Sequence, residues 1–350
     1  MSTAVASQNE TPPAPAGTGA RKLTERAFRI RESGIIVVLI VFVAVTASVQ
    51  PRFLNITNIQ FILVNTTVFA LLALGETMVV ISRNYDLSVG SVLGLSAYLS
   101  ASLFGGHPGF PIPLAFLAGL GIGLACGMLN GIMVAAGRVP SLVVTLATLY
   151  IFRGIDILIV GGKEVVANSL PSAFLEIPKA TVLGIPTLAI AIAVVIAIGA
   201  YYLRSFRSGR ELYAMGSNPE AARLTGIPVG KRVFVAFTVS GAIAGVAGVL
   251  WAAQYGTIDS TAGTGYELQV ISAVVVGGVA IFGGSGSVVG AALGALLLQT
   301  ISSALNVLGV ASIWTEAIAG FLLLVAITLD RGIQLRLAAA LRRRRVHLGA

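Results

Sequence analysis

The sequence contains few charged residues for its length. Only 11% of its 350 residues are Asp, Glu, Lys or Arg, whereas 56% are hydrophobic and the mean hydropathy is +0.92. One soluble core cannot cover that much apolar surface, so the composition excludes an ordinary soluble domain. The alternating segments of about ten residues that build a transmembrane β-barrel are also missing. The sequence therefore predicts an all-α protein that crosses a lipid bilayer several times.

Residues suited to catalysis or metal binding are scarce. The single cysteine, Cys126, excludes an internal disulfide, and we assign it to helix packing. His107 and His347 lie far apart, which leaves no metal-ligand or nucleophile-triad spacing. The phosphate-binding pattern G-x-x-x-x-G-K-[ST] is absent, because arginine follows the Gly-Lys pair at 230–231. We therefore expect a chain that is not an enzyme, holds no cofactor or metal, and does not hydrolyse ATP.

Long apolar runs dominate the sequence instead. Runs of about 20 residues match the hydrocarbon thickness of a bilayer when they are helical. Only a Gly/Ser link at Gly283–Gly286 separates the eighth run from the ninth, so a re-entrant pair is the alternative there. The sequence predicts ten spans, at residues 34–50, 60–82, 87–104, 111–136, 140–160, 184–203, 233–253, 267–283, 287–307 and 312–329.

The basic residues are unevenly distributed around these spans. With the N-terminus inside, 19 of the 23 lysines and arginines fall on cytoplasmic segments, as the positive-inside rule requires, and both termini are cytoplasmic. This bias explains the net charge of +9 without a nucleic acid partner, and we expect the run Arg342–Arg345 to contact anionic membrane lipid. We divide the chain into a disordered cytoplasmic tail (1–33), a transmembrane domain (34–330) with a large cytoplasmic loop (204–232), and a basic cytoplasmic tail (331–350).

Glycine recurs every fourth residue in the fourth span, at Gly119, Gly123, Gly127 and Gly131. This spacing leaves a stripe without side chains, where another helix can approach closely. We expect the stripe to pack helices together within the chain, with a direct lining of the pathway as the alternative.

The loop 204–232 has helix signals of its own. Asn218 is a good N-cap, Pro219 suits the first helical position, and Gly226 ends the pattern. We predict a two-turn helix at 219–225 that lies outside the membrane and docks in a partner protein, with a simple connector as the alternative. The predicted docking residues are Asn218, Pro219, Glu220, Ala221, Ala222, Arg223, Leu224, Thr225 and Gly226.

The same loop carries the first of three resemblances to a known family. The segment GRELYAMGSNPEAARLTGIPVGKRV, at 209–233, resembles the cytoplasmic coupling segment of ABC importer permeases of the ribose-type monosaccharide family. DLSVGSVLGL, at 86–95, resembles that family's other hallmark, and the glycine-rich stretch 274–310 resembles its C-terminal block. The likeness covers most of residues 34–329.

This resemblance implies a type II importer architecture, in which two copies of the permease form one pathway in the prokaryotic inner membrane. It also implies an ABC ATPase subunit that binds the ATP, and a periplasmic or lipid-anchored sugar-binding protein, which we expect to face loops 161–183 and 255–267. The expected solute is a monosaccharide, either a pentose or a deoxyhexose such as rhamnose. Many members carry Gly-Gly-Ile where this chain has Arg-Asn-Tyr at 83–85, which suggests a subgroup for rhamnose or a related deoxy-sugar and speaks against ribose itself. The alternatives are a furanose-like signalling molecule as solute, and an ion-coupled transporter built on Glu76 or Glu316.

Polar side chains within the spans are the predicted pathway residues, because such groups at membrane depth tend to face a cavity or a partner. Arg153 and Asp156 are three residues apart on one helical face, so we expect them to neutralise each other. Arg83 and Asp86 mark a tight cytoplasmic turn, with additional contact to the ATPase as the alternative. The predicted pathway residues are Asn65, Thr66, Glu76, Asn130, Gln299, Asn306 and Glu316.

Overall fold

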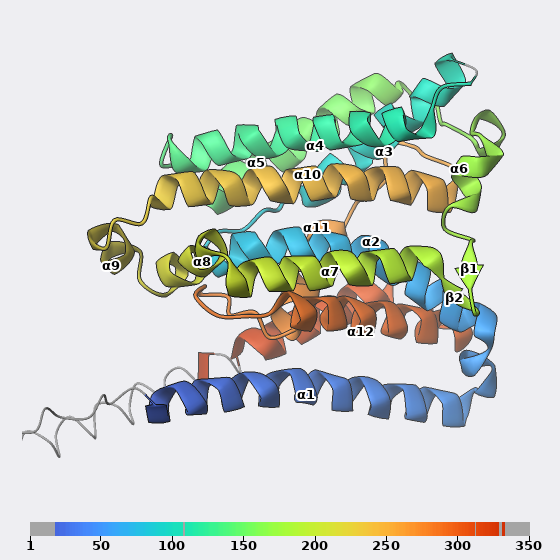
Figure 1. Cartoon of the computed structure of the whole chain (residues 1–350). Helices are drawn as coiled ribbons and strands as arrows, with labels where there is room; N and C mark the ends of the chain where they lie inside the picture. The colour runs from blue at the N-terminus through green and yellow to red at the C-terminus, as the bar shows by residue number, and fades with distance from the viewer. Residues whose placement is uncertain (1–17, 108, 312, 329–330, 333–350) are drawn as a thin grey trace, which may run out of the picture.

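The computed structural model describes residues 18–107, 109–311, 313–328 and 331–332. Its long helices lie side by side in one bundle and run from left to right in Figure 1. The helices that build the bundle are α1 (Thr18–Val49), α2 (Ile56–Ile81), α3 (Val89–Gly106), α4 (Ile112–Ala135), α5 (Ser141–Val160), α7 (Thr187–Ser205), α10 (Val229–Tyr255), α11 (Tyr266–Val276) and α12 (Val288–Val307), and a last apolar helix covers Trp314–Thr328. The short elements are η1 (Pro51–Leu54), η2 (Ala167–Ser169), α6 (Ser172–Glu176), α8 (Arg207–Ser217), α9 (Pro219–Leu224) and an antiparallel hairpin of β1 (Thr181–Val182) and β2 (Ile185–Pro186).

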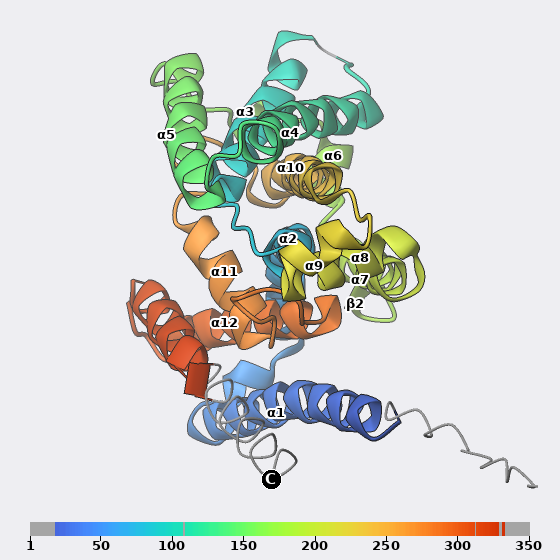
Figure 2. The same cartoon turned by 90° about the vertical axis from the view of Figure 1, so that its left-hand side faces the viewer.

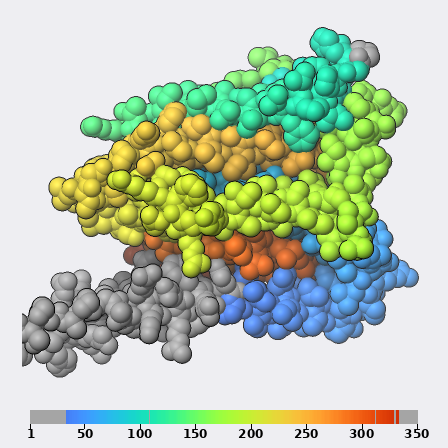
Figure 3. All heavy atoms as spheres, viewed as in Figure 1, coloured from blue at the N-terminus to red at the C-terminus, as the bar shows by residue number. Residues whose placement is uncertain are grey.

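The connections between helices gather at the two ends of the bundle. We call the left end in Figure 1, which carries α8 and α9, the α9 end, and the right end, which carries α6 and the hairpin, the α6 end. The turns after α2, α4 and α7 lie at the α9 end, and those after α1, α3, α5 and α10 lie at the α6 end. Figure 3 shows the yellow segment of α8 and α9 on the surface of the α9 end.

Helices long enough to cross a membrane make up most of the bundle. Among the described residues, seven are both long and apolar enough, namely α2, α3, α4, α5, α7, α10 and α12. Three shorter apolar helices cover Ser33–Val49, Tyr266–Val276 and Trp314–Thr328. Each predicted span therefore corresponds to a helix, and the prediction of an all-α membrane protein is confirmed.

The length predicted for the eighth span, residues 267–283, is wrong. α11 ends at Val276, and residues 277–287 form turns before α12 begins. Gly278 and Gly283 adopt positive φ angles of 92° and 76°, a conformation that does not fit a right-handed helix. The 11 residues of α11 rise by about 16 Å. This is roughly half of the 30 Å hydrocarbon thickness, so α11 is a half-span.

The first helix also differs from its prediction. α1 begins at Thr18 and not at residue 34, so part of the segment expected to be disordered is helical. Residues 1–17 and 333–350, which include the run Arg342–Arg345, lie outside the described residues.

α2 lies at the centre of the bundle (Figure 2), where it packs against α7, α10, α11 and α12. Every residue from Thr67 to Ile81 is buried. By contrast, α4, α5 and α7 expose large apolar side chains such as Leu117, Leu158 and Ile198. Outward apolar surface of this extent is stable only in an apolar surrounding, so the burial pattern agrees with helices that lie in lipid.

The glycine stripe of α4 lies against α10, as expected from its spacing. A Cβ added at Gly123 would overlap the carbonyl oxygen of Gly241, and one added at Gly119 would lie 3.0 Å from the carbonyl oxygen of Gly245. The two backbones are therefore in direct contact, which residues with a side chain would prevent. We call this contact the glycine seam.

Candidate functional site

A short capped helix, α9, lies beyond the ends of the long helices, at the left of Figure 1. Oδ1 of Asn218 accepts hydrogen bonds from the backbone N–H groups of Glu220 and Ala221, both at 3.1 Å. The cap satisfies N–H groups that the first helical turn leaves unpaired. The helix predicted at 219–225 is therefore confirmed, with its last helical residue at Leu224.

α9 presents a free surface on its outer side. Leu224 is 90% exposed, and Glu220 and Arg223 are exposed beside it. Ala222 is buried and holds the helix against the rest of the chain. The helix therefore offers both an apolar and a charged contact to any partner that approaches the α9 end.

Sequence reasoning missed α8, although Glu211 follows Arg207 at the i,i+4 spacing typical of a helix. Glu211 accepts a hydrogen bond from Nε of Arg232 in α10 at 2.6 Å, and another from Nε of Arg207 at 2.8 Å. These bonds, the one from Arg232 above all, hold the pKa of the Glu211 carboxyl below its usual value of 4.5. The carboxylate thereby ties α8, and with it α9, to the first turn of α10.

A cleft of about 740 Å³ opens at the α9 end. Three of its lining side chains are arginines, and we call it the arginine cleft: Arg83 follows α2, Arg138 follows α4, and Arg223 lies in α9. Arg83 and Arg138 have positive φ angles of 65° and 55°. This conformation costs roughly 1–2 kcal/mol in a residue with a Cβ, so both turns are held tightly by their surroundings. The other lining residues are Ser82, Asn84, Val134, Ala135, Val139, Pro140, Ser141, Met215, Pro219, Val229, Gly230 and Val233.

Arg83 and Asp86 both lie in the turn after α2, but one is exposed and the other is buried. Arg83 is exposed, and its Nη2 donates to the backbone oxygen of Ser217 at 3.0 Å. Asp86 is 1% exposed, and its Oδ1 accepts hydrogen bonds from the backbone N–H and the hydroxyl of Ser88 at 3.0 and 2.6 Å. The predicted tight turn is present. Contact with an ATPase, the alternative reading of this turn, stays a prediction. Burial withdraws the carboxylate of Asp86 from the surface, so Arg83 is the residue of this pair that a partner can reach.

Glu76 and Asn130 belong to the same buried cluster as Asp86. Oε1 of Glu76 accepts a hydrogen bond from the backbone N–H of Asp86 at 3.1 Å, and Nδ2 of Asn130 donates to Oγ of Ser88 at 2.8 Å. Both side chains are completely buried. They connect the turn after α2 to α2 itself and to α4, and neither lines the cavity at the opposite end of the bundle.

That cavity, of about 390 Å³, lies at the α6 end. Four predicted pathway residues line it, namely Asn65, Gln299, Asn306 and Glu316. The chain brings them together from α2, α12 and the last helix. We call it the amide cavity, after Asn65, Gln299, Asn306 and a fourth amide, Gln269. The other lining residues are Phe61, Ile62, Phe69, Tyr255, Thr264, Tyr266, Ser302, Ser303 and Thr315.

Polar and aromatic contacts build one wall of the amide cavity. Oδ1 of Asn65 accepts hydrogen bonds from Nε2 of Gln254 and from the hydroxyl of Tyr255, both at 2.9 Å. The rings of Phe69 and Tyr266 lie 4.5 Å apart between centroids. Sequence reasoning missed Tyr255 and Tyr266, because it searched the spans for charges and amides. The signal that could have found them is a tyrosine at each end of the polar loop between α10 and α11.

Thr66 does not join the amide cavity, although it follows Asn65 directly. It lines a separate groove of about 350 Å³ between α2, α7 and α12, whose other lining residues are almost all apolar. Its hydroxyl donates to the carbonyl oxygen of Ile62 at 2.7 Å. This backbone bond satisfies the hydroxyl without any solute.

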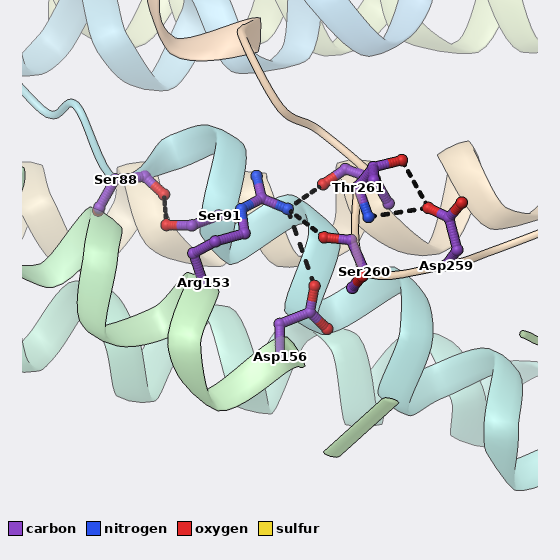
Figure 4. Close-up of polar contacts among 8 residues, drawn as sticks. Ser88, Ser91, Arg153, Asp156, Asp259, Ser260 and Thr261 are labelled. Carbon is purple, nitrogen blue, oxygen red and sulfur yellow. Dashed lines mark hydrogen bonds and ion pairs between the residues drawn. The ribbon is translucent and has the colours of Figure 1, made fainter. Parts of the chain in front are cut away.

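Arg153 of α5 fastens the loop between α10 and α11 (Figure 4). Its Nη1 donates to the carbonyl oxygen of Ala262 at 2.6 Å and to that of Ser260 at 3.2 Å. The same nitrogen lies 3.8 Å from Oδ2 of Asp156, so the expected neutralising pair is confirmed. Because the loop continues into the amide cavity at Thr264, Arg153 also positions one edge of that cavity.

The two loops predicted to face a binding protein are joined to each other. Val165 and Ile258 exchange backbone hydrogen bonds of 2.9 Å in both directions. Ile258 is completely buried, whereas Leu183, at the tip of the hairpin, is 98% exposed. The loops therefore form one continuous surface at the α6 end.

Known proteins similar to this chain are membrane transport components. The family model described as "Branched-chain amino acid transport system / permease component" matches residues 58–327. The autoinducer 2 import system permease protein LsrC of Enterobacter sp. (strain 638) is 35% identical over 300 residues, which cover 86% of each chain. The protein of the same name from Escherichia coli O157:H7 is 34% identical over 313 residues, 89% of this chain and 90% of that one. The one from Shigella flexneri is 34% identical over 315 residues, 90% of this chain and 91% of that one. No solved structure matches the chain.

Proposed function

Because this chain belongs to the family of transport system permease components, we propose that it forms the membrane pathway through which an ATP-driven importer takes up a small, hydroxyl-rich solute. The chain is an ABC importer permease, a multi-pass membrane subunit and not an enzyme, as its relatives are permeases of import systems. The resemblance that the sequence motifs carry is therefore confirmed at the level of the permease class.

The amide cavity is the observation that carries this proposal. Side-chain amides both donate and accept hydrogen bonds, so they suit hydroxyl groups, which do the same. Tyrosine and phenylalanine add flat apolar walls for the carbon skeleton of the solute. The volume of about 390 Å³ falls within the range of about 300–1,000 Å³ that is common for small-molecule sites. Among the described residues that line the cavity, Glu316 alone is charged, which favours a neutral solute over an ionic one.

For the solute itself we propose autoinducer 2. The relatives that match over most of this chain are named as autoinducer 2 import permeases, which supports the signalling-molecule alternative over rhamnose or another deoxyhexose. A pentose such as ribose remains compatible with the lining of the amide cavity, because its hydroxyls present the same donors and acceptors.

We further propose that the α9 end faces the cytoplasm. Arg83, Arg138, Arg207 and Arg232 all lie at that end, in agreement with the positive-inside rule. The ABC ATPase subunit, which binds the ATP, then meets α9, and a binding protein meets the joined loops at the α6 end. A second copy of the permease completes the pathway. Movement of α9 reaches the amide cavity through α10, which ends at Tyr255.

Competition uptake in cells that carry the complete importer tests the solute. We expect labelled autoinducer 2 to enter, and unlabelled autoinducer 2 to suppress the signal, whereas rhamnose, ribose and leucine at equal excess do not. Leucine is included because the family description mentions branched-chain amino acids. Failure of labelled autoinducer 2 to enter, or suppression of its entry by rhamnose, ribose or leucine as strongly as by unlabelled autoinducer 2, would contradict the proposed solute.

A further inference from the structure

We propose that the arginine cleft binds a carboxylate-bearing segment of the ATPase subunit, as a second contact beside α9. This inference rests on the proposed function, because it presupposes that the ATPase docks at the α9 end. It goes beyond docking through α9, because two of the three arginines, Arg83 and Arg138, belong to turns elsewhere in the chain.

The first argument is the geometry of the arginine cleft. Its volume of about 740 Å³ admits several side chains from a partner. It lies between the turn after α2, the turn after α4, and the start of α10, and Pro219 and Arg223 of α9 line it as well. A partner segment that enters the cleft therefore touches α9 at the same time.

The second argument is uncompensated charge. Elsewhere in the described part of the chain, arginines near carboxylates are paired: Arg153 with Asp156, and both Arg207 and Arg232 with Glu211. Within the described residues, none of the three cleft arginines has such an ion pair, and Arg83 makes only a neutral hydrogen bond to the backbone of Ser217. All three are exposed, so solvent screens their mutual repulsion, but no carboxylate of the described residues occupies them and their remaining donors are free to meet an anion from a partner.

The third argument is the chemistry of the guanidinium group. Its planar fork of N–H donors matches a carboxylate with two parallel hydrogen bonds, which makes the contact directional as well as attractive. We assign the anion to a protein and not to a lipid headgroup, because the cleft borders α9 and the turn that ends the central helix α2 (Figure 2). A lipid headgroup would contact the helices at the perimeter of the bundle before it could contact this cleft.

Charge reversal at Arg138 tests the proposal, since Arg138 lies outside α9. The permease is placed in nanodiscs of neutral lipid, and its affinity for the purified ATPase subunit is measured at low and high salt. Arg138→Glu is expected to weaken binding by about ten-fold or more at low salt, with a smaller loss at high salt. Arg204→Glu is the matched control: Arg204 is exposed near the same end of the chain but does not line the cleft, and its reversal is expected to change the affinity much less.

A second variant guards against a failure of folding. Arg138→Gln removes the charge without reversing it, and should weaken binding to an intermediate degree while the protein elutes as a single species in size exclusion. Equal affinities for wild type, Arg138→Glu and Arg204→Glu would overturn the cleft proposal, even where ATP-driven uptake by the wild type upholds the proposed function. The same affinities are also measured in discs that contain anionic lipid. If Arg138→Glu weakens ATPase binding only in those discs, the cleft binds a lipid headgroup, and the cleft proposal is overturned.

Discussion

The two ends of this bundle differ in the chemistry that they offer. The amide cavity at the α6 end is lined by Asn65, Gln299 and other neutral hydrogen-bonding and aromatic groups, whereas the arginine cleft at the α9 end presents three guanidinium groups. Neutral groups that both donate and accept suit a hydroxylated solute, and a cationic cleft suits an acidic protein surface. The difference agrees with the proposed function, in which the solute binds at the α6 end and the ATPase subunit binds at the α9 end.

One helix connects the two ends. α10 contributes Gly230 and Val233 to the arginine cleft and Tyr255 to the amide cavity. Between these points its backbone touches α4 along the glycine seam. A displacement that passes from α9 to the start of α10 can therefore reach the amide cavity through one long helix.

The largest effect is expected at the glycine seam, because it supports both ends. Gly123→Leu would push a side chain into the backbone of α10 and should destabilise the fold by about 3 kcal/mol or more. Solute uptake and ATPase binding should fall together. Gly121→Leu is the control, since nothing lies within 4 Å of a Cβ added there. Thermal unfolding in detergent measures the difference, and equal melting temperatures for the two variants would show that the seam is not tightly packed.

The next largest effect is expected in the amide cavity, where a substitution should lower uptake without changing the affinity for the ATPase. Gln299→Leu keeps the side-chain volume but removes a donor and an acceptor from the amide cavity, so uptake should fall by about ten-fold while affinity for the ATPase stays unchanged. Thr66→Val, at a residue that lines only the apolar groove, should leave both properties as they are. Initial uptake rates and ATPase binding are measured on the same preparations. If Thr66→Val impairs uptake and Gln299→Leu does not, the pathway lies in the apolar groove instead.

A smaller effect is expected for a substitution on α9, which should change the affinity for the ATPase and leave the fold intact. Leu224→Asp places a charge at a position that is 90% exposed, so the fold should be unaffected while affinity for the ATPase falls by about three-fold to ten-fold. Leu183→Asp makes the same change at a position that is 98% exposed at the α6 end and should leave that affinity unchanged. Equal affinity losses in the two variants would point to a general effect of added negative charge.

The smallest effect concerns the attachment of α8 to α10. The pKa of Glu211 is lowered in the folded chain by Arg232 and Arg207, so its contribution to stability is present above the usual value of 4.5 and is lost as the pH falls through the lowered pKa. Glu211→Gln should therefore melt slightly below the wild type at neutral pH, and the gap should close in acid. Melting temperatures recorded from neutral to acidic pH test this, and a gap that persists at every pH would contradict the role of the ionised carboxylate.

The sequence predicted the features that depend on local patterns. Apolar runs indicated the spans, and α9 followed from the cap at Asn218, because both signals reside within a few consecutive residues. The pathway could not be resolved in the same way. Asn65 and Thr66 are neighbours of similar polarity, yet they line different openings, because the helices packed around α2 decide what each face meets. The burial of Asp86 and the early end of α11 likewise depend on contacts between distant segments.

Uptake into proteoliposomes tests the central claim most directly. The purified chain is reconstituted alone, and also together with its ATPase subunit and binding protein, and entry of labelled autoinducer 2 is followed with ATP, with a proton gradient and with a sodium gradient. We expect entry only into vesicles that contain all the subunits and ATP. Entry into vesicles that contain this chain alone, driven by either ion gradient, would contradict the assignment as an ATP-dependent permease and would instead support an ion-coupled transporter.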